Sequence, residues 1–281
     1  MPELPEVETI RRQLAPLVQG RRLERVEILD ARWSRPLAPR ELADALEGRK
    51  VESLGRRGKY LVWDLEEDVH LVQHLRMTGA VLCDPDPEPL HTRVRMDLGQ
   101  GRRLAIVDPR RFGTGELLLG GKALEEFFAV RLGLEPLDVR FTAEHLRGLA
   151  RGRTAPIKAF LLDQRRIAGV GNIYADEALF RAGIHPLRSA GRLSLEQYTR
   201  LRETTIAALQ AGIEARGATI DDFRHVDGVR GSFQNQFLVH RREGEPCGKC
   251  GTTIVKMVVA GRGTYVCETC QLRPRRRRRR V

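Results

Sequence analysis

Four cysteines near the C-terminus have the spacing of a metal site. Cys247 and Cys250 lie in the stretch CGKC, Cys267 and Cys270 lie in CETC, and sixteen residues separate the two pairs. Four thiolates at this spacing suit one tetrahedral zinc ion, with no open coordination position for catalysis. The intervening TTIVKMVVAGRGTYV predicts two strands with a turn at AGRG. The sequence therefore predicts a structural zinc and a β-hairpin with Arg262 exposed at its tip.

Four glycine-containing stretches could bind nucleic acid. In GVGNIYADEALF, two glycines precede a helix whose first turn holds Asn172, and free backbone N–H groups at such a turn can bind phosphate. HLRMTG and DPRRFG each place an apolar residue, Met77 or Phe112, beside arginine and glycine, which suits side chains that wedge between stacked bases. Lys59 lies at a glycine turn in GRRGKYLVWDL. The alternatives are that Met77 and Phe112 are core residues and that Lys59 is a solvated surface charge.

The N-terminus, MPELPEVETI, combines two prolines with three acidic residues. Proline is tolerated at the start of a helix, and carboxylates near that end interact favourably with the helix dipole. On position alone, helix initiation is the simplest interpretation of Pro2, Glu3 and Glu6. Val7, Ile10 and Leu14 then recur at helical spacing.

The charge of the chain indicates a polyanionic partner. The formal net charge is +12 over 281 residues, and because Arg275–Arg280 supply six positive charges, the remainder still carries +6. A basic body with a basic tail favours nucleic acid as the partner. The tail itself is expected to be a solvated, disordered extension that adds nonspecific affinity. No apolar run is long enough to span a membrane, and acids stand where a signal peptide is basic, so a cytoplasmic protein is expected.

The remaining patterns predict the elements that position these residues. Short apolar-rich stretches predict strands in the first half, with a hairpin turn at GQG: KYLVWDL, HLVQHL, TRVRMDL and RRLAIVD. Helical patterns follow, and Ser194 with Gln197 fits a capping box at the start of the longest: FTAEHLRGL, PIKAFLLDQ, NIYADEALFRAGI and SLEQYTRLRETTIAALQAGIEARG. The sequence thus predicts an α+β protein with an N-terminal β-sandwich and flanking helices, a C-terminal helical domain and a zinc β-hairpin. The predicted domains are 1–134, 135–243, 244–272 and a tail at 273–281.

Taken together, the motifs resemble the formamidopyrimidine-DNA glycosylases, which are bacterial base-excision repair enzymes. The resemblance covers nearly the whole chain, in the same order: PELPEVE, KYL, HLRMTG, DPRRFG, GVGNIYADEALF, GIHP and GRGTYVCETCQ. It implies a helix-two-turn-helix DNA-binding domain. It also implies a bifunctional DNA glycosylase and AP lyase that excises 8-oxoguanine and formamidopyrimidines from damaged double-stranded DNA. The related endonuclease VIII branch typically opens with a PEGPEI-like motif and is less similar.

The resemblance assigns a chemical role to the N-terminus. After removal of the initiator methionine, the secondary amine of Pro2 would attack the sugar C1′, displace the base and form a Schiff base that leads to β,δ-elimination. Family precedent makes Glu3 the general acid and gives Glu6 a supporting role. Lys59 would assist β-elimination, and Arg262 would assist δ-elimination and bind phosphate.

The resemblance also implies how the protein holds DNA. The matched DNA-contact positions are His74, His91, Arg110, Arg153, Lys158 and Asn172. Met77, Arg110 and Phe112 would fill the gap that the flipped nucleotide leaves, and a loop at about Thr219 to Gly231 would cover the lesion. Family members act as monomers, in the cytoplasm beside the nucleoid. Two features depart from the family pattern: the arginine tail, and Arg76, where many relatives have glycine.

Three other functions compete with this one. An enzyme of the endonuclease VIII type would prefer oxidised pyrimidines, but the opening motif and the wedge residues argue against it. A DNA-binding module without catalysis would follow if Met1 were retained. An RNA-binding zinc-ribbon protein would need aromatic stacking platforms, whereas aromatic residues make up only 5% of the chain.

Overall fold

The computed structural model describes residues 2–219, 226–228 and 230–274, which form two compact units. The first unit holds the chain up to Arg131 together with Gly212–Gln234, and the second holds Leu132–Ala211 and the chain from Asn235 onward. The finer predicted division at residues 134, 243 and 272 stays a prediction. Within the described ranges, no helix has the length and apolar character needed to cross a bilayer.

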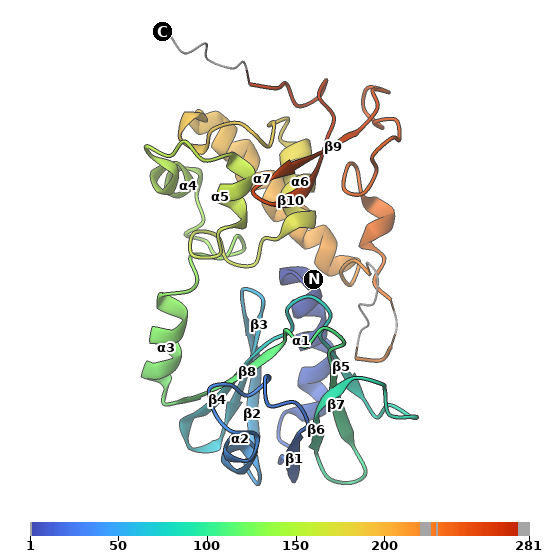
Figure 1. Ribbon diagram of the computed structural model, residues 1–281. Helices are drawn as coiled ribbons and strands as arrows, with labels where there is room; N and C mark the ends of the chain where they lie inside the picture. The colour runs from blue at the N-terminus through green and yellow to red at the C-terminus, as the bar shows by residue number, and fades with distance from the viewer. Residues whose placement is uncertain (1, 220–225, 229, 275–281) are drawn as a thin grey trace. The chain divides into compact units, whose positions relative to one another are not determined.

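Two four-stranded antiparallel sheets form the framework of the first unit (Figure 1). The first sheet has the order β1-β6-β7-β5, with strands at Arg25–Ile28, Thr92–Asp97, Arg103–Val107 and Ala80–Cys83. The second has the order β2-β3-β4-β8, with strands at Val51–Arg57, Tyr60–Leu65, Val69–His74 and Thr114–Leu119. The hairpin predicted at GQG is confirmed, because β6 and β7 pair across it with Asp97 opposite Arg103.

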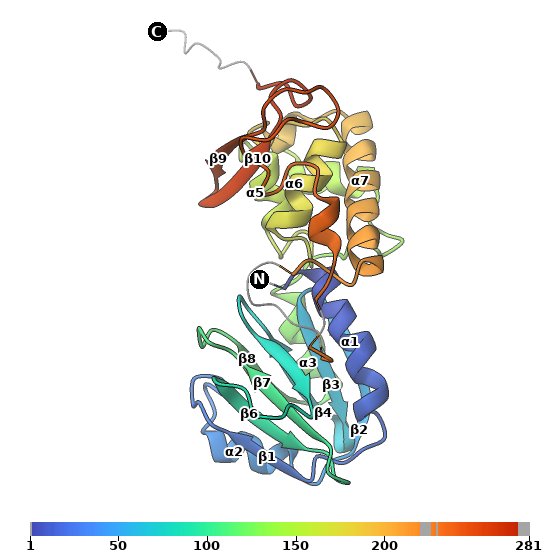
Figure 2. The ribbon, with the colours of Figure 1, turned by 90° about the vertical axis from the view of Figure 1, so that its right-hand side faces the viewer.

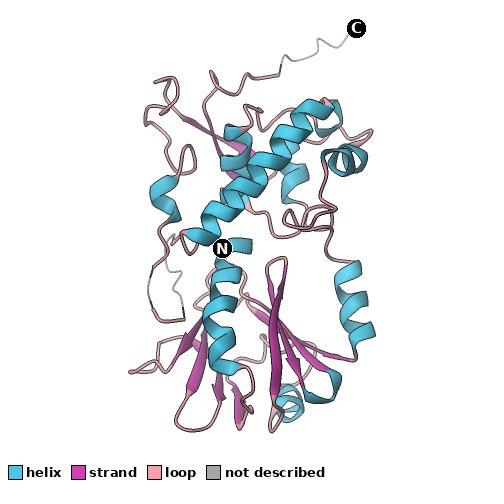
Figure 3. Cartoon of the chain, turned by 180° about the vertical axis from the view of Figure 1, so that it is seen from behind, coloured by secondary structure: helices cyan, strands magenta, loops and turns pink. Residues whose placement is uncertain are grey.

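Helix α1 (Leu4–Val18) runs lengthwise beside the strands of this unit (Figures 2 and 3). Its buried side chains Val7, Ile10 and Leu14 join residues of both sheets in one apolar core, as their helical spacing predicts. Two further helices belong to the unit: α2 (Pro39–Leu46), which packs against β1, and α3 (Gly121–Ala129), which follows β8. A 3₁₀ turn at Glu66–Asp68 connects β3 and β4.

The second unit is helical and ends in the hairpin. Its helices are α4 (Ala143–Ala150), α5 (Ile157–Leu162), α6 (Asn172–Arg181) and α7 (Leu195–Glu214), whose last residues from Gly212 are assigned to the first unit. A 3₁₀ turn at Ala190–Arg192 belongs to the second unit, and another at Phe233–Gln236 lies where the chain re-enters it. All four occupy predicted segments. The predicted capping box starts α7, since the Ser194 N–H donates to Gln197 Oε1 at 3.0 Å and the Gln197 N–H donates to Ser194 Oγ at 3.2 Å. The hairpin strands β9 (Val255–Val259) and β10 (Arg262–Val266) pair with each other, and β10 packs on α6.

The predicted α+β class is therefore confirmed, with two N-terminal sheets, a helical part and a C-terminal hairpin. The sequence patterns did not identify β1, β2, β5 or β8, nor α2 and α3. Strands β1 and β2 show no strict alternation of buried and exposed residues, which is the signal that predicts a half-buried strand.

Candidate active site

The N-terminus is fixed by a buried carboxylate. Pro2 and Glu3 are buried, and Glu3 precedes the first turn of α1, where its carbonyl accepts a hydrogen bond from the Val7 N–H at 3.0 Å. Glu6 is 1% exposed, and its Oε2 accepts the Glu3 N–H at 2.8 Å. This bond fixes the backbone directly after Pro2. The helix-start interpretation is thus confirmed, and it is compatible with a chemical role for the same residues.

The other oxygen of Glu6 binds a segment far along the chain. Its Oε1 accepts the Ala218 N–H at 2.7 Å, across 212 residues. The preceding residue must be small, because Gly217 has a φ of +77° and a Cβ there would lie 2.8 Å from Glu6 Cγ. With one oxygen on the Glu3 N–H and the other on the Ala218 N–H, the carboxylate of Glu6 joins the N-terminus to the stretch that leads into the predicted lesion-covering loop.

The ends of that loop are joined to each other. Gly231 N–H donates to Thr219 Oγ1 at 2.8 Å, and Thr219 N–H donates to Gln234 Oε1 at 2.9 Å. Residues 220–225 and 229 of the predicted loop lie outside the described residues, as does the arginine tail from Arg275 onward.

Glu8 is a buried acid that sequence reasoning did not single out. Burial alone would raise its pKa, but hydrogen bonds from Arg11 and Arg12 and the charge of Arg56 lower the pKa of Glu8 to about 2. Arg56 lies on β2, and its Nε is 3.1 Å from Glu8 Oε2. The carboxylate therefore stays ionised at neutral pH and attaches α1 to the second sheet.

Lys59 occupies a tight turn beside β3. It follows Gly58 in the two-residue connection between Arg57 and Tyr60, where glycine at the first position is typical of a type II′ hairpin turn. Lys59 is 5% exposed. The alternative of a solvated surface lysine is therefore wrong.

His74, at the end of β4, is neutral and buried. Burial, followed by the nearby charges of Arg76 and Lys59, lowers the pKa of His74 to about 3. Its Nδ1 accepts the Arg76 N–H at 2.9 Å, so the neutral ring carries its proton on Nε2. The ring packs edge-on against Tyr60, with centroids 4.5 Å apart. His74 can thus donate a hydrogen bond but does not supply positive charge to a DNA phosphate.

The two apolar residues of the predicted wedge are exposed. Met77 is 39% exposed and Phe112 is 49% exposed, so neither is a core residue. The Arg110 guanidinium lies 4.9 Å from the centre of the Phe112 ring. His91 is also exposed, with a positive φ of 72°, and its carbonyl accepts the Asp108 N–H at 3.1 Å. These residues form an apolar and cationic surface on the first unit.

The structure gives Lys158 a different setting from the phosphate contact that the resemblance implies. Its side chain is fully buried on α5, and its ammonium lies 2.7 Å from Asp176 Oδ1, 2.7 Å from Thr264 Oγ1 and 3.0 Å from the Gly263 carbonyl. An ammonium paired in this way in the interior fits a structural role under the zinc hairpin better than direct contact with DNA. Asn172 binds the same Gly263 carbonyl through Nδ2 at 3.0 Å.

The two remaining cationic residues of the predicted site, Arg153 and Arg262, are exposed on the second unit. Arg153 is exposed, and its Nε donates to the Leu149 carbonyl at 2.8 Å. Arg262 is the exposed first residue of β10. The turn before it, Ala260–Gly261, has positive φ at both residues, as a type I′ hairpin turn requires. The predicted hairpin with an exposed arginine at its tip is confirmed.

The four predicted zinc ligands converge. The sulfur atoms of Cys247, Cys250, Cys267 and Cys270 all lie within 4.8 Å of one another. Tetrahedral zinc with Zn–S bonds of about 2.3 Å requires sulfur–sulfur separations of about 3.8 Å. The observed separations include 3.9 Å for Cys247–Cys270 and 3.6 Å for Cys250–Cys270, so the donor set fits Zn²⁺.

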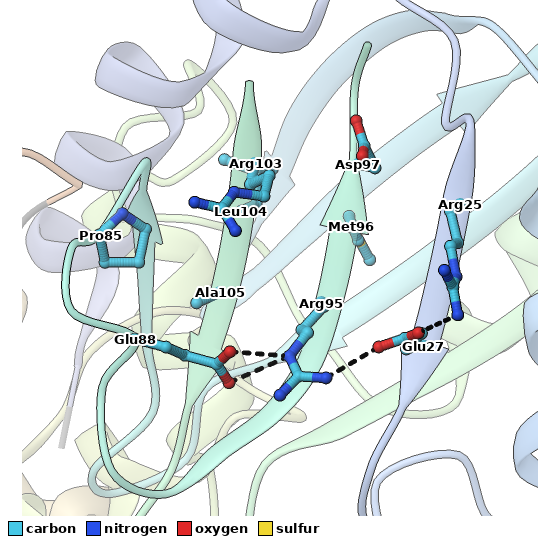
Figure 4. A pocket seen from close by; sticks show the side chains of 10 residues that line it. All are labelled: Arg25, Glu27, Pro85, Glu88, Arg95, Met96, Asp97, Arg103, Leu104 and Ala105. Carbon is cyan, nitrogen blue, oxygen red and sulfur yellow. Dashed lines mark hydrogen bonds and ion pairs between the residues drawn. The ribbon is translucent and has the colours of Figure 1, made fainter. Parts of the chain in front are cut away.

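One hollow in the first unit lies away from these residues. It has a volume of about 230 Å³ over strands β1, β6 and β7 (Figure 4). Four of its charged side chains form ion pairs, since Arg95 on β6 binds Glu27 on β1 and Glu88 before β6, and Arg25 binds Glu27 on the same strand. None of the predicted catalytic or wedge residues lines it.

Three family models match successive parts of the chain. They are the formamidopyrimidine-DNA glycosylase N-terminal domain over residues 1–115, the H2TH domain of the same family over residues 132–224, and the zinc finger found in FPG and IleRS over residues 244–273. The formamidopyrimidine-DNA glycosylase of Bacillus licheniformis is 44% identical over 277 residues, which cover 96% of this chain and 99% of that protein.

Solved structures give the same result. The crystal structure of MutM (Fpg) from Thermus thermophilus superposes with a TM-score of 0.87 at 44% identity, covering 96% of this chain and 98% of that one. A Lactococcus lactis Fpg variant in complex with DNA containing Fapy-dG superposes with a TM-score of 0.91 at 35% identity, covering 97% of this chain and 100% of that one.

Proposed function

The chain belongs to the formamidopyrimidine-DNA glycosylase family, and on this premise we propose that it excises oxidised purines from damaged duplex DNA with Pro2 as the nucleophile. It is a DNA glycosylase and AP lyase by its relationship to these enzymes. The observation that supports Pro2 as the nucleophile is the hydrogen bond from the Glu3 N–H to the Glu6 carboxylate, because it fixes the backbone immediately after Pro2. We also expect the protein to act as a monomer in the bacterial cytoplasm.

The first step is displacement of the damaged base. Once Met1 has been removed, Pro2 carries a free secondary amine, and an α-amine has a pKa of about 8, so a neutral fraction exists at physiological pH. The amine attacks the sugar C1′ while the bond from C1′ to the base breaks. Glu3 protonates the ring oxygen as the sugar opens, since a carboxyl group beside the amine can transfer protons to the reacting centre.

The second step is strand cleavage. Proline forms an iminium ion with the opened sugar, and this cation has no N–H to lose, so it remains positively charged. The charge makes the C2′ hydrogen acidic, and removal of that proton expels the 3′ phosphate. A second elimination expels the 5′ phosphate. One residue thereby serves both glycosylase and lyase chemistry.

Cationic side chains support the eliminations and the binding of DNA. Lys59 is assigned to β-elimination, and its burial in the β2–β3 turn supports a role other than surface solvation. Arg262 is assigned to δ-elimination and phosphate binding, which its exposure on β10 supports. A zinc ion held by the four cysteines would have a structural role, because it leaves no open coordination position. The exposed arginines contribute salt-dependent affinity for the phosphates.

The test is covalent trapping of the Schiff base. The purified protein is mixed with a duplex containing 8-oxoguanine opposite cytosine, borohydride is added, and the adduct is mapped by mass spectrometry. Attachment at Pro2 is the expected result. Attachment at a lysine, or no adduct with DNA binding intact and Met1 removed, would contradict the proposal. A duplex with an oxidised pyrimidine then separates a different lesion preference from a protein that only binds lesions.

Two variants sharpen this test. Lys59→Gln removes the buried amine of the other predicted catalytic residue and must still yield the Pro2 adduct. Glu3→Gln keeps the amine but lacks the proton donor, so it should trap on a preformed abasic site much faster than on 8-oxoguanine.

A further inference from the structure

The buried carboxylate of Asp108 links the two turns that carry the wedge side chains, and we propose that Asp108 is a positioning residue for base flipping. The inference rests on the proposed function, because it concerns how this protein opens a duplex at the lesion. Asp108 directly follows the last residue of β7, and its side chain is buried, with 1% of the residue exposed. The role is indirect, because the carboxylate acts through Met77, Arg110 and Phe112.

The two oxygens of Asp108 hold different turns. Oδ1 accepts the hydroxyl of Thr78, the residue after Met77, and the Arg110 N–H at 3.3 Å. The Arg110 N–H also donates to Thr78 Oγ1 at 3.3 Å, so the Asp108 carboxylate, the Thr78 hydroxyl and the Arg110 N–H are all hydrogen-bonded to one another. Oδ2 accepts the Gly113 N–H at 2.7 Å. The turn that contains Met77 and the turn that contains Phe112 are therefore both hydrogen-bonded to the same carboxylate.

The backbone of Asp108 is itself held by neighbouring residues. Its N–H donates to the His91 carbonyl at 3.1 Å, and its carbonyl accepts Arg93 Nε at 2.9 Å. The carboxylate also has little free space, because a Cβ at Gly113 would lie 3.1 Å from Oδ2. Asp108 is thus a fixed point from which both turns extend.

The wedge side chains depend on this fixed point because they extend from the turns into solvent. Met77 and Phe112 are exposed, and the Arg110 guanidinium packs on the Phe112 ring within the same turn. A side chain that fills the gap in a base stack must be held rigidly, since displacement of a positioned group by about 1 Å can cost about 100-fold in rate. Loss of the carboxylate would leave the two turns free to move independently.

The experiment compares two substrates in single-turnover cleavage. One is a duplex with 8-oxoguanine opposite cytosine, and the other is the same duplex with a preformed abasic site. Extrusion from the stack costs least where the base is already missing, so the abasic site depends less on the wedge. The measured quantity is the ratio of the two rates, because a general loss of folded or active enzyme lowers both rates together and leaves the ratio unchanged.

Three variants of the zinc-loaded, full-length protein are compared with the wild type. Asp108→Asn should lower the ratio by about tenfold, which corresponds to about 1.4 kcal/mol. Thr78→Val removes the hydroxyl that donates to Asp108 and accepts from the Arg110 N–H, while the Arg110 N–H keeps Asp108 as an acceptor. The net loss is one hydrogen bond, which should lower the ratio by about threefold. Thr78→Ser keeps the hydroxyl and should restore the ratio. Fluorescence of 2-aminopurine opposite the lesion should report less unstacking in the first two variants.

Each outcome decides the matter. An unchanged ratio in Asp108→Asn and Thr78→Val, or equal losses on both substrates, would overturn the positioning role. If Asp108→Asn does not fold, the comparison of Thr78→Val with Thr78→Ser decides alone. A wild-type protein that cleaves neither substrate would overturn the proposed function instead, and with it this inference.

Discussion

Replacing Glu6 by glutamine should weaken the first unit and misplace the nucleophile. Each oxygen of the buried carboxylate accepts one backbone N–H, at 2.8 Å from Glu3 and 2.7 Å from Ala218. Glutamine retains one acceptor and turns an NH₂ group towards the other donor. Loss of a hydrogen bond to a charged group costs about 2 kcal/mol, and a buried donor left without a partner adds about 1 kcal/mol. We therefore expect the free energy of unfolding to fall by about 3 kcal/mol, which lowers Tm by about 6–12 °C.

The chain contains a natural probe for this effect. Its two tryptophans, Trp33 and Trp63, are both buried in the first unit. Tryptophan fluorescence during urea or thermal unfolding therefore reports on the unit that contains Glu6. Single-turnover excision of 8-oxoguanine by the same variant should fall by about 100-fold, because a shift of about 1 Å in a reacting group can have that effect.

Glu41→Gln is a matched control. Glu41 occupies the corresponding position in the first turn of α2, where its Oε2 accepts the Ala38 N–H at 3.4 Å, but it is exposed. Such a surface change should alter stability by less than about 0.5 kcal/mol. If Glu6→Gln and Glu41→Gln unfold at the same urea concentration, and excision is unaffected, the structural reasoning about Glu6 is refuted.

Three further predictions concern other parts of the molecule. The pKa of Glu8 is lowered from 4.5 to about 2, so the stabilising contribution of its carboxylate is present above about pH 5 and disappears as the pH falls towards 2. The difference in urea midpoint between wild type and Glu8→Gln should therefore shrink from pH 6 to pH 3. A difference that stays constant would contradict this. Phe112→Ala should leave the tryptophan-detected unfolding curve within about 0.5 kcal/mol of wild type, because the ring is 49% exposed, while excision of 8-oxoguanine slows by about tenfold; a destabilised protein would show that the ring packs in the core. Cys267→Ser should abolish binding of the single zinc measured by metal analysis and weaken duplex binding, with the tryptophan-detected unfolding of the first unit unchanged; full zinc content would exclude Cys267 as a ligand.

Local patterns in the sequence predicted local structure well. The capping residues Ser194 and Gln197 mark the start of α7, and the cysteine pairs with AGRG between them mark the hairpin. Each of these signals lies within a few residues of the element that it specifies. The exposure of Met77 and Phe112, by contrast, depends on packing and was only one of two interpretations of the sequence.

The long-range features of the site could not be predicted from local patterns. Glu6 and Ala218 lie 212 residues apart, and no periodicity connects them. The burial of Lys158 against Asp176 and Thr264 reverses the usual expectation for a lysine, because an ammonium enters the interior only when partners replace its water. The motif DPRRFG contains Asp108 but gives no sign that its carboxylate bonds to a second turn, at Thr78, as well as to its own.

The division of the first unit between two stretches of sequence has a consequence for synthesis of the protein. Residues 212–234 belong to the unit that begins at the N-terminus, although Leu132–Ala211 are translated in between. At about 5–20 residues per second, the ribosome needs about 5–20 s to make the residues between Arg131 and Gln234. A nascent or prematurely terminated chain that ends before Ala218 therefore lacks one of the two partners of Glu6. An enzyme that cuts DNA strands thus acquires its complete N-terminal unit only after most of its chain has been made.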